Sequence, residues 1–112
     1  MQTHETQGVT VAVVSGRVTL GENTNQLRTA VKALLDAGHK KLVLDLGKVD
    51  YIDSSGLGTL VGLSTSALGA GAALKLAQVT GRIHELLVLT KLLTVFDIYD
   101  SEAAAVASFS GA

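Results

Sequence analysis

The 112-residue sequence contains no cysteine and no proline. Without cysteine there are no disulfides, no thiolate catalysis and no zinc–thiolate sites. Without proline, and with neither an internal repeat nor a low-complexity linker, no segment is typical of an interdomain hinge. Tryptophan is also absent and only four residues are aromatic, so leucine, valine and alanine must build the core. We therefore expect a single domain over residues 1–112, ordered over about residues 8–109 and frayed at both ends.

The chain also lacks an excess of positive or negative charge. Nine basic and ten acidic residues give a formal net charge of −1, and the basic residues are dispersed. Such a chain has no basic patch for a nucleic-acid backbone or an anionic membrane. Residues 1–7 lack the basic and apolar regions of a signal peptide, and no apolar run approaches the roughly 18 residues of a membrane span. We expect a cytoplasmic protein that neither inserts into membranes nor binds DNA directly.

The hydrophobic pattern predicts an α/β fold with a mixed five-stranded sheet and about four helices. Residues 9–14 and 17–20, around Ser15-Gly16, are expected to form an N-terminal antiparallel hairpin. Strands at 42–46, 73–77 and 94–99 alternate with helices, which favours parallel pairing. The four helices are expected after a cap at Asn23 or Thr24, from the serines at 54 and 55 to Gly69, after Thr80, and from Ala103 to about Phe109.

The most informative stretch is residues 42–62, LVLDLGKVDYIDSSGLGTLVG. An apolar strand leads through a short charged turn into a helix. The strand is expected to begin its exit at Asp45 and Gly47. Asp53, Ser54 and Ser55 are residue types that cap a helix, because their side-chain oxygens accept the first free amides. The helix dipole there favours an added negative charge, as in a phosphorylation switch. The plainer interpretation of such a serine is an N-cap, worth about 1 kcal/mol.

Enzymatic motifs are missing around these serines. A P-loop needs Gly-Lys-Ser/Thr after its glycines, and a hydrolase elbow needs Gly-x-Ser-x-Gly; the chain has neither. The three histidines lack metal-ligand spacing, so we expect solvated side chains at His4, His39 and His84. With no nucleophile beside a base, we predict no catalysis and no cofactor.

Three further features leave alternatives open. Asp45 lies in an apolar strand, where a carboxylate needs partners: either a basic or hydroxyl group near the motif, or water at the strand end. Gly62 within a helix costs roughly 1 kcal/mol unless the sheet or a partner packs closely there. The apolar cluster at residues 86–89 and 92–93 is either core or an exposed partner-binding patch.

The segment VDYIDSSGLG, residues 49–58, resembles the signature of the STAS family, and in particular of bacterial anti-sigma-factor antagonists. The resemblance covers nearly the whole chain and implies a single STAS-like domain. In that family the serine after the aspartate is phosphorylated, which implies Ser54. The implied partner-binding residues lie around it: Asp53, Ser54, Ser55, Gly56, Leu57, Gly58 and Thr19.

The resemblance also implies what the protein does. Its unphosphorylated form would bind an anti-sigma factor that is itself a serine kinase, phosphorylation would release that partner, and a separate serine phosphatase would reset Ser54. The chain departs from the family at Gly16-Arg17-Val18-Thr19, where Gly-Glu-Leu/Ile-Asp is usual, which leaves partner identity open. The alternative is an accessory or scaffold STAS subunit, in a lipid-transport ABC assembly or a stress-sensing complex, without a phosphorylation switch.

Overall fold

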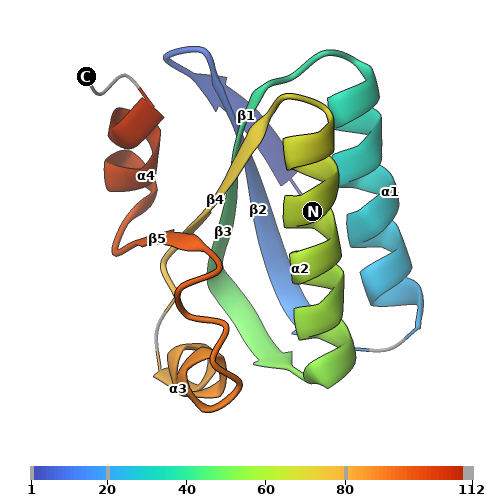
Figure 1. Ribbon diagram of the computed structural model, residues 1–112, viewed down its shortest axis with the longest axis vertical. Coiled ribbons are helices and arrows are strands. Elements are labelled where there is room, and N and C mark those ends of the chain that lie inside the picture. Colours follow the sequence, from blue (N-terminus) through green and yellow to red (C-terminus); the bar gives the residue numbers. More distant parts are fainter. Residues whose placement is uncertain (1, 20, 80, 110–112) are drawn as a thin grey trace.

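The computed structural model describes residues 2–19, 21–79 and 81–109, which form one five-stranded sheet with four helices (Figure 1). The strand order is β1-β2-β3-β4-β5, in which β1 and β2 are antiparallel and the other neighbouring pairs are parallel. The predicted mixed α/β fold is confirmed. In chain order the elements are β1 (Gln2–Thr6), β2 (Val9–Val18), α1 (Glu22–Asp36), β3 (Lys41–Ile52), α2 (Ser54–Gly69), β4 (Ala73–Ala77), α3 (Gly81–Leu89), β5 (Asp97–Tyr99) and α4 (Glu102–Phe109).

The antiparallel hairpin lies earlier in the chain than predicted. Its turn is Gln7-Gly8, with φ of 51° and 77°, the positive values that a tight two-residue hairpin turn requires. Ser15-Gly16 is not a turn: β2 continues through it, and its register with β3 shifts on either side of this pair. Gly16, at φ 79°, therefore serves an irregular strand. The expected fraying was also wrong for Gln2–Thr6, which pair with β2 as a polar edge strand; residue 1 lies outside the described residues.

β3 is longer than predicted, and β5 is shorter. Asp45 and Gly47 do not end β3, because its pairing with β2 continues to Ile52 opposite Val18. Its pairing with β4 stops at Asp45, so the expected charged turn is a strand tail held by β2 alone. The predicted strand at 94–99 is reduced to Asp97–Tyr99.

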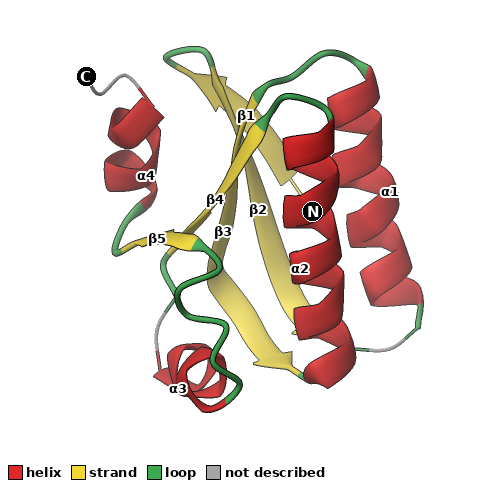
Figure 2. Ribbon diagram, in the orientation of Figure 1, coloured by secondary structure: helices red, strands yellow, loops and turns green. Residues whose placement is uncertain are grey.

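Helices cover the two faces of the sheet unequally. Figure 2 shows α1 and α2 side by side on one face and α4 on the other. Among the described residues, twenty form the core on the α1 and α2 side, whereas six, all valine or alanine, form the core under α4. α3 adds Ile83 and Leu87 to the larger core and lies at the end of the molecule where α2 begins (Figure 1).

The helix ends follow most of the predicted signals. α1 buries Leu27 and Val31 as expected, and Gly38 with φ 92° follows its last turn. Its cap is Gly21 instead of Asn23 or Thr24, both of which lie within the helix. Ser101 caps α4 by accepting from the Ala104 amide at 3.0 Å. The predicted Thr80 cap and the expected fraying at 110–112 lie outside the described residues. Within the described ranges, no helix is long and apolar enough to cross a membrane.

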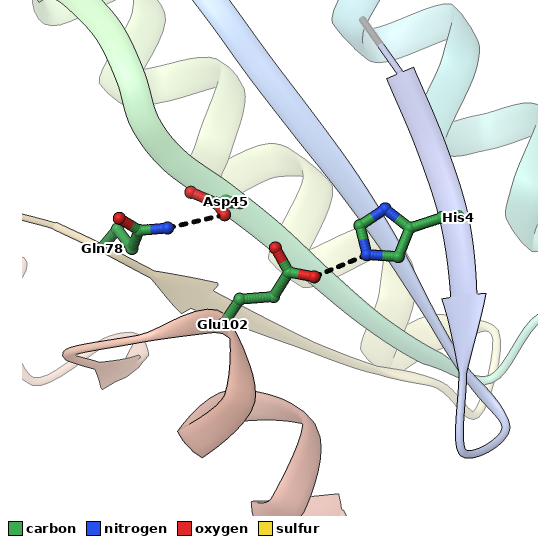
Figure 3. A network of polar contacts seen from close by, with 4 residues as sticks. All are labelled: His4, Asp45, Gln78 and Glu102. Carbon is green, nitrogen blue, oxygen red and sulfur yellow. Dashed lines mark hydrogen bonds and ion pairs between the residues drawn. The ribbon is translucent and has the colours of Figure 1, made fainter.

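The buried Asp45 carboxylate finds its hydrogen-bond partners on the α4 side of the sheet (Figure 3). Asp45 is buried, and its carboxylate accepts from the Gln78 side-chain amide and from the Gly47 amide, both at 2.9 Å. Neither predicted alternative is right, because the partner is a neutral amide 33 residues away. A side chain at Gly47 would meet Gln78 Oε1 at 2.8 Å, so glycine lets Gln78 approach.

Two of the histidines hold structural contacts instead of being fully solvated. His4 Nε2 lies 2.5 Å from Glu102 Oε1 and joins β1 to α4 (Figure 3). His39, two residues before β3, has its Nδ1 2.8 Å from Thr10 Oγ1 of β2. The third histidine, His84 of α3, is exposed as expected.

Candidate functional site

The first turn of α2 is capped by Asp53. Asp53 has an extended backbone, and its Oδ1 accepts from the Gly56 amide at 2.8 Å. Its carbonyl accepts the first intrahelical bond, from the Leu57 amide at 2.9 Å. The interpretation of Asp53 as the cap is confirmed, which makes Ser54 the first residue of the helix rather than its N-cap.

Two amides at this helix end have no acceptor among the residues that the structure describes. A helix has four N-terminal amides that lack intrahelical partners. Here Asp53 N donates to Val18 O at 3.3 Å, and Gly56 N donates to the Asp53 carboxylate. No described residue accepts from the amides of Ser54 and Ser55. They and the helix dipole favour negative charge at this position.

Close contact with the end of β2 fixes the position of α2. A side chain at Gly56 would place its Cβ 2.1 Å from Val18 O and 2.7 Å from Ile52 Cγ1. Only glycine fits this contact without movement of the backbone. Thr19, the half-buried residue after Val18, is thereby held beside the first turn of α2.

The predicted partner-binding residues do not all reach the surface. Ser54 and Gly58 are exposed, and Asp53, Ser55 and Thr19 are half-buried. Leu57 is only 2% exposed and belongs to the core, and Gly56 is buried against β2. The Leu57 side chain and the Gly56 backbone face the core, so neither residue is exposed to a partner in this structure, and their predicted role in binding stays a prediction.

The outer face of α2 is bare near its start. Around Gly58 and Gly62, an added Cβ would have no neighbour within 4 Å. Of the two alternatives for Gly62, close approach of the sheet is therefore excluded, and approach of a partner stays a prediction. This face offers a partner unobstructed backbone on the same helix as Ser54.

Comparison with known proteins agrees with this geometry. The family profile of the STAS domain matches residues 1–105. The chain belongs to the STAS domain family.

Two relatives and one fold neighbour illustrate the match. BtrV of Bordetella bronchiseptica, named as an anti-sigma factor antagonist, is 30% identical over 105 residues, which cover 94% of this chain and 90% of BtrV. The crystal structure of TM1081 from Thermotoga maritima, with the same designation, has a TM-score of 0.87 and 25% identity over 96% of this chain and 92% of that one. The Bacillus cell fate determinant SpoIIAA, in its phosphorylated form, shares the fold with a TM-score of 0.74 and 15% identity, over 96% and 97% of the two chains.

Sequence reasoning missed two groups of residues around the start of α2 in this STAS domain. Arg28 of α1 donates to Thr59 Oγ1 at 3.4 Å, and Thr59 in turn donates to Ser55 O at 3.0 Å. The guanidinium groups of Arg17 and Arg82 lie 5.1 and 5.9 Å from the centre of the Tyr51 ring. Each group joins residues about thirty positions apart, so no local pattern could reveal it. Among the described residues, no three His, Asp or Glu side chains lie close enough together to hold a metal ion.

The two glycines of the first turns predict opposite effects on the stability of this STAS domain. Gly56→Ala should lower the free energy of unfolding by about 1–3 kcal/mol or more, because the new methyl group overlaps the Val18 carbonyl. Gly58→Ala, its matched control, should raise it by about 0.5–1 kcal/mol, because alanine favours helix and the site is open. Urea unfolding measures both. Equal effects would contradict the close contact between α2 and β2.

Proposed function

We propose that this STAS domain is a cytoplasmic anti-sigma factor antagonist that phosphorylation of Ser54 switches off. Its unphosphorylated form binds an anti-sigma factor that is also a serine kinase, and a serine phosphatase restores that form. The observation that carries the proposal is the exposed Ser54 hydroxyl, first in α2 and directly after the capping Asp53. The names of BtrV and TM1081 support the antagonist role.

Exposure favours Ser54 over its neighbouring hydroxyls as the phosphate acceptor. Ser55 is half-buried, and Thr59 is 7% exposed with its hydroxyl bonded to Ser55 O. A kinase must bring the hydroxyl in line with the γ-phosphate of its nucleotide. Gly58, on the next turn, adds no side chain in the way of that approach.

The switch we propose acts through charge at an interface. A phosphate adds about −1.5 to −2 charge, next to the Asp53 carboxylate. A partner shaped for a neutral hydroxyl would have to desolvate both groups together. The complex would dissociate while the STAS domain stays folded.

The first test identifies the modified residue. Incubation with ATP, magnesium and the serine-kinase anti-sigma factor of the same genome should give one phosphate, on Ser54. Tandem mass spectrometry locates it. Ser55→Ala should be phosphorylated like the wild type, and Ser54→Ala should not. Phosphate on Ser55 or Thr59, from a kinase proven active, would defeat the assignment.

The second test measures binding by calorimetry. Ser54→Ala should retain affinity for that anti-sigma factor, whereas Ser54→Asp should lose several kcal/mol, because a like charge at a desolvated interface is repelled. Thr65→Asp is the charge control, since Thr65 is exposed on the same helix about 16 Å further along. Equal dissociation constants for the alanine and aspartate variants at position 54 would remove the electrostatic mechanism.

The third test separates a binding switch from a folding switch. The free amides and the dipole favour the phosphate by about 0.3–1 kcal/mol, and repulsion from Asp53 opposes this. We therefore expect the two forms to melt within a few degrees of each other, because about 1 kcal/mol shifts a domain of this size by about 4–8 °C. Circular dichroism should be unchanged. A much larger fall in melting temperature would indicate that the switch works by local unfolding.

A further inference from the structure

The surface immediately around Ser54 is too small and too bare to hold a partner alone. The exposed positions in the first two turns of α2 are Ser54 and Gly58. A stable interface buries about 800 Å² on each partner, and its binding energy is concentrated in a few large side chains, often tyrosine and arginine. Other residues at this end of the molecule must supply that area.

A cationic aromatic cluster lies on the tail of β3 that leads to Ser54. Tyr51 precedes the capping Asp53 by two residues, on the tail of β3 that only β2 pairs. Tyr51 is 36% exposed, and Arg17 of β2 and Arg82 of α3 both place guanidinium groups over its ring. Stacking on the ring holds these side chains in place, so less conformational entropy is lost when they bind a partner.

An exposed apolar ridge continues from this cluster along α3. Leu87 faces the core, whereas Val88 and Leu89 are 49% and 78% exposed. The apolar cluster at residues 86–89 thus contains both core and surface, the two alternatives that the sequence left open. Leu89 stands between two open depressions of about 260 and 280 Å³; Val88 lines the first, and Arg82 lines the second.

Arg82 therefore joins the two features into one surface. It stacks on Tyr51 and also lines the depression beside Leu89. Glu85 lines both depressions, so the ridge is apolar with a mixed rim, while the part around Tyr51 carries two arginines. α3 and the start of α2 lie at the same end of the molecule (Figure 1).

We propose that Arg17, Tyr51, Arg82 and Leu89 form the larger part of the docking surface for the anti-sigma factor. This rests on the proposed function and adds the chemistry of the partner, which presents carboxylates to the two arginines and an apolar pocket to Leu89. Charge complementarity selects such a partner. The same carboxylates repel a phosphate on Ser54, which gives the switch a second source of repulsion beside Asp53.

The decisive experiment compares two exposed leucines. Leu89→Ser should weaken binding of the anti-sigma factor about tenfold or more, as truncation of an interface anchor does. Leu68→Ser is the matched control, because Leu68 is 71% exposed near the opposite end of α2 and should bind like the wild type. Calorimetry gives both dissociation constants, and thermal melting of each variant checks that it is folded.

A charge reversal tests the cationic part. Arg82→Glu should slow association about tenfold at low salt and much less at high salt, because steering by charge is screened. Lys41→Glu, at the opposite end of β3, should leave the association rate unchanged.

The outcomes separate this inference from the proposed function. Wild-type affinity for Leu89→Ser, while Ser54→Asp still abolishes binding, would overturn the extended surface and leave the switch intact. A change in self-association alone on Leu89→Ser would also overturn it, because the occupant would then be a second copy of the chain. Failure of the wild type to bind the kinase would overturn both proposals.

Discussion

The hydrogen bond from the Gly56 amide to the Asp53 carboxylate, together with the contact of Gly56 with Val18, fixes where α2 begins. The cap sets the first helical residue, and the contact sets the distance of that residue from the sheet. If the helix began one residue later, Ser54 would become the cap, and its hydroxyl would be occupied by a backbone amide. The exposure of the Ser54 hydroxyl thus depends on Asp53 and Gly56.

The unequal lengths of the central strands shape the surface around this point. β3 runs seven residues beyond its last pair with β4, so its tail is paired on one side only. That tail carries Tyr51 past the body of the sheet, into reach of an arginine from β2 and another from α3. Binding sites in α/β proteins commonly lie at the carboxyl ends of strands, where loops and helix starts converge. Thr19, Tyr51 and Ser54, which belong to the proposed site, all lie at such strand ends.

The sequence predicted the local features well. The Asp53 cap spans three residues, and the helix and strand boundaries at α2, β4 and α4 follow from periodicity with nearby glycine or serine signals. The predictions that failed concerned residues whose structure depends on partners far away in the sequence. Ser15-Gly16 has the composition of a turn, and only its pairing with β3 makes it an irregular strand. The Asp45 carboxylate is satisfied by Gln78, which no pattern near position 45 announces.

The candidate site also has features that local sequence predicts and features that depend on tertiary packing. The position of Ser54 could be predicted because capping is local, whereas the burial of Leu57 depends on how α2 packs against the sheet. Arg82 and Tyr51 are 31 residues apart and meet only because α3 lies at the end of β3. Sequence reasoning therefore located the proposed phosphate acceptor but not the larger surface that we propose beside it.

The difference between the two cores has a consequence for how the molecule fluctuates. α4 is held by a small alanine- and valine-rich cluster, the His4–Glu102 contact and a hydrogen bond from Lys75 to Ser108, whereas α2 packs into the main core. Segments with little buried apolar area open at lower free energy than the global unfolding reaction. Amides of α4 should thus exchange with solvent through local opening, while those in the buried turns of α2 exchange only when the whole domain unfolds. Transient detachment of α4 then leaves the geometry around Ser54 undisturbed, because the two helices lie on opposite faces of the sheet.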